Sequence, residues 1–154
     1  MQAHQDYHVT PLSQTDLADL TKARVEFQSL ALPLTIDRSD LAWSQCRSPR
    51  TTRLVHNNAG TGRGNDESEP SDAAFHLALP AGCPNRRVLR AAGALREEAE
   101  LYRQWSVSRS STDEHLALLG AALDRDAGRA ADLLREHIAH TARLLVDPAR
   151  GAGT

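Results

Sequence analysis

Four side chains between residues 72 and 137 have the types and the spacing that metal binding requires. Asp72 and His76 stand four residues apart, so on a helix they lie one turn apart on the same face. A carboxylate and an imidazole on adjacent turns can hold one cation together. A solvated helix pair or a cap has the same spacing, so this pair alone leaves both interpretations open.

Two further histidines lie at equal distances from a predicted turn. His115 is eleven residues before Asp126, and His137 is eleven residues after it. In an antiparallel helical hairpin that bends at Asp126, both imidazoles lie about 16 Å from the bend, because each residue rises about 1.5 Å. Both histidines also belong to largely apolar faces that point inward. A shared metal ion or a hydrogen-bonded core pair would each account for this arrangement.

Taken together, the four side chains offer three nitrogens and one carboxylate oxygen. This donor set suits a divalent transition metal, namely zinc, nickel, manganese or iron. Four protein ligands in a helical bundle leave one or two positions for water or for the carboxylate of a ligand. The other histidines are interpreted as having no part in the site: His4, His8, His56 and His140.

The segments that must position these residues are predicted to be helical. A first helix, capped by Ser13 or Thr15, carries Leu17, Leu20, Arg24, Phe27, Leu30, Ala31 and Leu34 on one face. Further helices are predicted over about 40–56, 71–79, 88–105, 112–124 and 127–146, with loops at 57–70 and 80–85. No strand pattern is visible, so the sequence predicts an all-α fold. Its predicted parts are a leader at 1–13, a ligand-binding domain at 14–146 and a flexible tail at 147–154.

The composition excludes several classes of protein. A chain of 154 residues fits one domain. A net charge of -2 argues against a surface that binds nucleic acid. The longest apolar run is too short to cross a membrane, and the polar first ten residues form no signal peptide. Cys46 and Cys83 make neither a disulfide framework nor a metal motif. We therefore expect a cytoplasmic protein with no nucleic-acid or membrane partner.

Three segments resemble one known family. Residues 72–79 and 85–89 resemble the core signature of the FCD domain, the C-terminal effector-binding domain of FadR-type regulators in the GntR family. Residues 114–119, 125–126 and 134–138 are similar to the end of that domain, and residues 16–24 are similar to its first helix. The resemblance covers roughly residues 12–146.

The resemblance implies a fold and a set of functional residues. The fold is an antiparallel helical bundle with a central ligand cavity that contains the metal. The implied metal ligands are Asp72, His76, His115 and His137. Arg24 corresponds to an arginine of the family's first helix, which implies that it binds the ligand; a surface arginine is the alternative. The implied effectors are small organic acids.

The sequence also departs from the family. The winged helix-turn-helix that precedes this domain in family members is not recognisable in residues 1–13, so we expect no direct operator binding. Pro33, Pro49 and Pro80 fall where the resemblance implies helix interior, at a cost of about 3 kcal/mol or more each. These helices are therefore expected to be kinked or to end early. Gln28 stands where the family usually has glutamate.

Three functions remain compatible with the sequence. The leading hypothesis is a metal-dependent domain that binds and senses a small carboxylate, and that acts as a homodimer or by pairing with a full-length regulator. The second is a metalloenzyme that uses the same pocket for chemistry on a small organic acid. Against it, no independent general base, nucleophile or cofactor motif lies near the predicted ligands. The third is a decayed remnant without activity.

Overall fold

The computed structural model describes residues 13–38, 74–103 and 112–146, and all regular structure in these ranges is helical. The helices are α1 (Gln14–Arg38), α5 (Arg86–Arg103), α6 (Thr112–Leu123) and α7 (Ala127–Val146), with a short helical segment at residues 74–78. The predicted all-α fold is confirmed. The predictions for residues 40–56, for the 57–70 loop, for Asp72 and for Pro49 lie outside the described residues.

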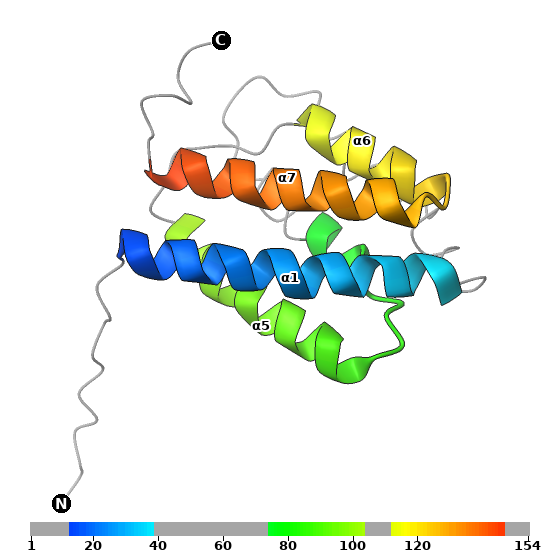
Figure 1. The fold of residues 1–154 in the computed structure, drawn as a ribbon, viewed down its shortest axis with the longest axis horizontal. Helices are drawn as coiled ribbons and strands as arrows, with labels where there is room; N and C mark the ends of the chain where they lie inside the picture. Colours follow the sequence, from blue (N-terminus) through cyan, green and yellow to red (C-terminus); the bar gives the residue numbers. More distant parts are fainter. Residues whose placement is uncertain (1–12, 39–73, 104–111, 147–154) are drawn as a thin grey trace, which may run out of the picture.

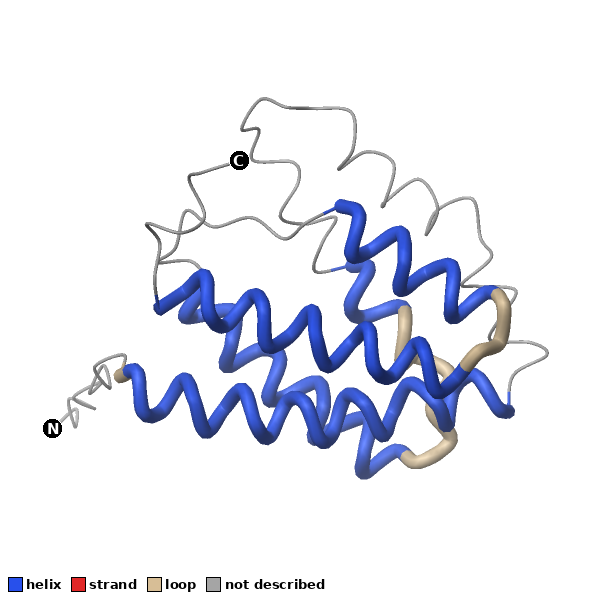
Figure 2. The backbone as a smooth tube through the Cα atoms, turned by 45° about the horizontal axis from the view of Figure 1, so that its top comes forward, coloured by secondary structure: helices blue, strands red, loops and turns tan. Residues whose placement is uncertain are grey.

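The helices form an antiparallel bundle. Helix α1 packs against α7 on one side and against α5 on the other, while α6 packs against α7. Figure 1 shows α1 and α6 running in one direction and α5 and α7 in the opposite one. Figure 2 shows the tight turn that joins α6 to α7. Among the helices of the described ranges, none has the length and apolar character that crossing a bilayer needs.

One large cluster of buried side chains connects the elements that surround the histidines. Its members are Leu32 and Ile36 of α1, Phe75 and Leu79, Leu118, Leu119, Ala121 and Ala122 of α6, and Ala130, Leu134 and Ile138 of α7. A second, smaller cluster of Ala31, Cys83 and Ala92 lies between α1 and α5. Small side chains at these positions let the two helices approach closely. The histidine-bearing elements are therefore held by the larger of the two clusters.

Helix α1 buries part of the predicted face, namely Leu17, Leu20, Arg24 and Ala31, but not all of it. The backbone N–H of Asp16 donates to Ser13 Oγ at 3.0 Å, so Ser13 is the cap. Phe27 and Leu30, which were placed on the inward face, are 40% and 50% exposed. Gln28 and Ser29 are buried instead. Apart from Arg24, the predicted face consists of apolar residues, so it did not include Gln28 and Ser29.

The prolines have different effects on the two segments that contain them. Helix α1 continues past Pro33 to Arg38, so an early end at this position is wrong. The segment at residues 74–78, by contrast, gives way to a turn before Pro80, as predicted. The N–H of Cys83 donates to the carbonyl oxygen of Pro80 at 2.9 Å, and the Thr35 hydroxyl lies 3.2 Å from the same oxygen. The turn that ends the helical segment after His76 is thus anchored to α1.

Polar caps set the beginnings of the other helices. The N–H groups of Arg87 and Val88 lie 3.1 and 3.3 Å from Asn85 Oδ1, so Asn85 is a cap. At the turn between α6 and α7, the N–H of Arg129 donates to Asp126 Oδ1 at 3.0 Å. Arg125 takes a left-handed conformation, with φ of 60°. The hairpin predicted to bend at Asp126 is confirmed.

Candidate metal centre

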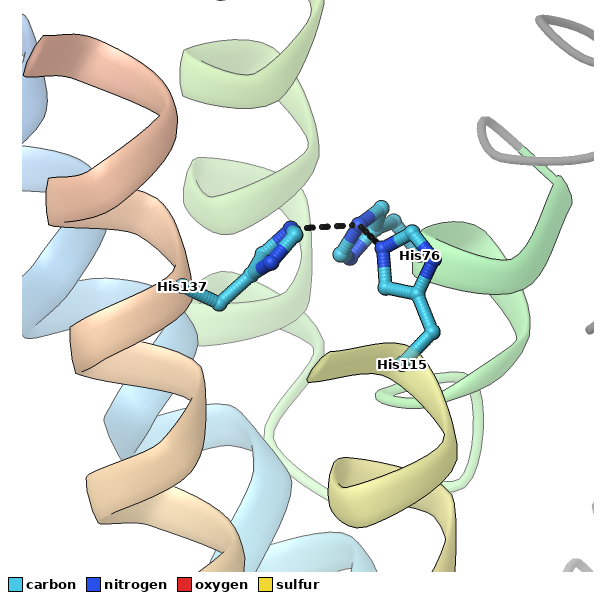
Figure 3. A group of neighbouring side chains, drawn as sticks. All are labelled: His76, His115 and His137. Atoms are coloured by element: carbon cyan, nitrogen blue, oxygen red, sulfur yellow. Dashed lines mark hydrogen bonds between the residues drawn. The ribbon is translucent and has the colours of Figure 1, made fainter. Parts of the chain in front are cut away.

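Three of the four predicted ligands converge on one point. Figure 3 shows His76, from the segment at residues 74–78, between His115 of α6 and His137 of α7. The Nε2 atom of His76 lies 3.1 Å from Nε2 of His115 and 3.1 Å from Nε2 of His137. The ring centroids of His115 and His137 are 4.7 Å apart. This spacing agrees with the register obtained by counting from Asp126.

The surrounding packing explains why these rings point inward. His115 and His137 are buried, with 1% and 4% of their surface exposed, and His76 is half-buried. The Phe75 ring, itself fully buried, lies 4.8 Å from the ring of His115 and 5.3 Å from that of His76. The rings of His76 and His115 are therefore packed against the apolar core through Phe75.

The convergence of three imidazole nitrogens is a better fit to a cation than to protons. A neutral imidazole carries one N–H, and its other nitrogen has one lone pair. His76 Nε2 lies within hydrogen-bond distance of both other Nε2 atoms, yet it can hold only one proton or accept with one lone pair. A single cation would accept all three lone pairs. Tetrahedral Zn–N bonds of about 2.0–2.1 Å give N–N separations of about 3.3 Å, close to those found.

The three candidate ligand atoms all lie within 4.8 Å of one another. Asp72, the fourth predicted ligand, lies outside the described residues, so its role stays a prediction. Three imidazoles leave at least one position of a four-coordinate ion for another ligand. The chemistry that such a group can support is the binding of an anionic oxygen, from a protein carboxylate, water or a small molecule.

A carboxylate that the sequence analysis did not single out lies directly behind His137. Glu114 Oε2 lies 2.8 Å from Nδ1 of His137, and Oε1 lies 2.5 Å from Nδ1 of His140. The hydrogen bond from His137 lowers the pKa of Glu114; partial burial acts in the opposite direction, and the hydrogen bond from His140 also lowers it. His140 was assigned no role in the site from the sequence, yet Glu114 connects His140 to His137.

The sequence did contain a signal for this arrangement. Glu114 directly precedes His115, and His140 follows His137 by three residues, which is one helical turn. A hairpin that brings His115 level with His137 must also bring Glu114 close to the turn that bears His140.

Two polar residues of α1 lie on its buried side. Arg24 is only 9% exposed, so the surface alternative for this arginine is wrong. Gln28, one turn further on, is 7% exposed, and its Nε2 has no hydrogen-bond partner among the described residues. Val25, which neighbours Arg24, lines a pocket together with Glu114 and His137. This level of α1 is therefore close to the histidines, and the ligand-binding role of Arg24 stays a prediction.

Comparison with known proteins identifies a family by sequence, and a solved structure has a similar fold. The FCD domain family matches residues 19–140. The chain is 32% identical over 146 residues to the uncharacterized HTH-type transcriptional regulator BphR of Paraburkholderia xenovorans (strain LB400), covering 89% of this chain and 60% of that protein. It is 28% identical over 144 residues to the HTH-type transcriptional repressor GlaR of Escherichia coli (strain K12), covering 86% and 65%.

The fold is similar to that of a solved GntR family transcriptional regulator from Pseudomonas syringae pv. tomato str. DC3000. The TM-score is 0.74 at 21% identity, over 92% of this chain and 60% of the other. The chain spans between 60% and 65% of the length of the two curated relatives. With the family match extending over residues 19–140, this chain belongs to the FCD domain family, the effector-binding domains of GntR-type transcriptional regulators.

Proposed function

We propose that this FCD domain senses a small organic acid through a divalent transition metal bound by His76, His115, His137 and Asp72. The observation that carries the proposal is the convergence of three Nε2 atoms, with both contacts of His76 at 3.1 Å. Zinc, nickel, manganese and iron all suit this donor set. When bound, the metal supplies a Lewis-acidic seat for a carboxylate oxygen.

The buried polar residues of α1 support a second contact to the same ligand. Arg24 offers a guanidinium that pairs well with a carboxylate, and the amide of Gln28 offers a neutral donor. Both are within the apolar bundle, where a charge-assisted hydrogen bond is stronger than in water. An acid that reaches from the metal to α1 would therefore be held at both ends.

The regulatory output is proposed from the relatives. Both curated relatives are described as HTH-type transcriptional regulators, one of them as a repressor. We propose that binding of the acid alters the activity of a transcriptional regulator, with this domain acting as a homodimer or in a pair with a full-length regulator. Size-exclusion chromatography with light scattering tests the self-association, with a single monomeric peak as the contrary result.

The metal is tested first by elemental analysis of the purified, dialysed protein. We expect about one divalent metal per chain, and loss of the metal in the His115→Ala, His137→Ala double variant. Acidification should release the metal, because protons compete with the metal for the imidazole nitrogens. Absence of metal from the wild-type protein, or unchanged content in the double variant, would contradict the proposed site.

The ligand is tested by thermal unfolding with a series of mono-, di- and tricarboxylates. A bound acid should raise the melting temperature of the metal-loaded protein by mass action, and the effect should vanish after chelation. Arg24→Ala should weaken the effect without changing metal content, whereas Arg90→Ala, at an exposed position of α5, should leave it unchanged. Equal stabilisation of the chelated protein would show that the metal is not part of the ligand site.

A further inference from the structure

We infer that Glu114 is a positioning residue for the metal centre: it holds His137 in the form that presents Nε2 to the centre, while His140 holds Glu114. The inference rests on the proposed metal site. Its basis is a continuous row of three side chains, in which Glu114 lies 2.8 Å from His137 and 2.5 Å from His140. The exposed fraction of the side chains falls along the row, from 39% for His140 to 31% for Glu114 and 5% for His137.

The contact with Glu114 selects one tautomer of His137. An ionised carboxylate only accepts hydrogen bonds, so the Nδ1 atom of His137 must carry the proton that bridges to Oε2. In the neutral ring, the lone pair then lies on Nε2, the atom that faces His76 at 3.1 Å. A metal-binding histidine is commonly oriented by a carboxylate in this way, which also makes the ring a better ligand.

Glu114 is partly exposed to solvent, so a second contact, in addition to the one with His137, is needed to fix its carboxylate. An open pocket of about 630 Å³ is lined by Val25, Glu114, His137 and His140, among others. A carboxylate beside such a pocket would otherwise exchange its protein partner for water. The contact between Oε1 and His140 fixes the plane of the carboxylate, since His140 lies one turn beyond His137 on α7.

The arrangement also fixes α6 against α7. Glu114 and His115 are consecutive residues in the first turns of α6, and one approaches His137 from behind while the other faces the centre. The two helices are thus held at the level of the proposed metal by a polar contact in addition to apolar packing. Removal of Glu114 should weaken metal binding without removing a ligand.

The first test measures zinc affinity by competition with a chromophoric chelator. Glu114→Gln, which keeps the shape of the side chain, should bind zinc about 10- to 100-fold more weakly than the wild-type protein. His140→Ala should give a smaller loss in the same direction. Glu136→Gln is the matched control, because Glu136 is an exposed glutamate that lines the same pocket; its affinity should stay within about twofold. Wild-type affinity in Glu114→Gln would overturn the inference.

The second test reads the tautomer directly and needs no metal. Long-range ¹H–¹⁵N correlation spectra of the metal-free protein should show His137 with its proton on Nδ1, and Glu114→Ala should lose that preference. A His137 ring with its proton on Nε2 in the wild-type protein would overturn the inference. If the wild-type protein shows the Nδ1 form but binds no zinc, the proposed function fails while the orienting contact stands.

Discussion

Helices α7 and α1 both face the core, but they present different kinds of side chain to it. The buried residues of α7 are Ala130, Ala131, Leu134, His137, Ile138 and Ala142. Those of α1 are Leu17, Leu20, Arg24, Gln28, Ser29, Ala31, Leu32, Thr35 and Ile36. One polar residue interrupts an apolar stripe in α7, whereas nearly half of the buried face of α1 is polar. Helix α1 also exposes Phe27 and Leu30.

This difference in buried polarity affects the stability of the two helices. A buried donor without a partner costs about 1–3 kcal/mol, so a helix optimised for stability alone would not retain one. Gln28 Nε2 and Ser29 Oγ have no partner among the described residues. Proteins commonly accept such costs at functional sites. Under the proposed function, α6 and α7 supply metal ligands, and the buried polar groups of α1 lower its stability but are placed where a ligand could contact them.

The largest expected effect on the free energy of unfolding comes from the apolar buried face of α7. Ile138→Ala should lower the free energy of unfolding by about 2–5 kcal/mol, because Ile138 is 1% exposed and lies in the main cluster. Leu30→Ala on α1 removes a similar side chain that is 50% exposed, and should cost about 0.5 kcal/mol or less. Urea unfolding of both variants measures the difference. Equal losses would show that the face of α1 bearing Leu30 is covered in solution.

Gln28→Leu tests whether the buried polar residues of α1 lower its stability. Replacing a buried, unpartnered amide by an apolar side chain of similar size should raise the free energy of unfolding, by about 1–3 kcal/mol at most. The same variant should bind carboxylates more weakly. Glu26→Leu, on the exposed face of α1, is the control and should change neither property strongly. A destabilised Gln28→Leu protein would mean that the amide has a partner that the comparison overlooks.

The N-caps of α7 and α1 should differ in their contribution to the free energy of unfolding, but by a smaller amount than the substitutions above. Asp126→Ala should cost about 1 kcal/mol, since it removes the acceptor for the N–H of Arg129 at a turn that fixes two helices. Ser13→Ala removes the equivalent contact from α1, but the first turn of α1 can fray without disturbing the core, so the cost should be lower. Chemical denaturation distinguishes the two. A larger loss for Ser13→Ala would reverse this ranking.

The smallest expected effect concerns the contact that joins the start of α1 to the end of α5. The hydroxyl of Tyr102 donates to the Asp16 carboxylate, which raises the pKa of Tyr102, as do desolvation and the charge of Asp16. Tyr102→Phe should cost about 0.5 kcal/mol or less, because both groups are exposed. A raised pKa means that the contribution is present below about pH 10 and is lost as the pH rises through the raised value. The difference in melting temperature between the two proteins should be smaller at pH 11 than at pH 8, and an equal difference at both values would contradict this origin.

Local patterns predicted the α6–α7 hairpin well. The bend at Asp126 and the boundaries of the two helices depend on residues within one or two turns of each other. His115 and His137 could be placed at one level because helical rise and a known turn fix the register. Pro80 likewise ended its segment through a missing donor and a clash within one turn. These features depend on residues close together in the chain, so they can be predicted from the sequence.

Long-range choices were beyond the sequence. Whether α1 turns Gln28 or Phe27 inward depends on what α5 and α7 place opposite it, and the apolar pattern of α1 is too weak to decide. The approach of His76 to the two other histidines and the bridging of His137 and His140 by Glu114 depend on how separate elements pack. The sequence by itself determined the described helices and the level of two histidines. Only the tertiary structure decided that Gln28 and Ser29 are buried while Phe27 and Leu30 are exposed, and which polar groups meet, because those contacts join residues far apart in the chain.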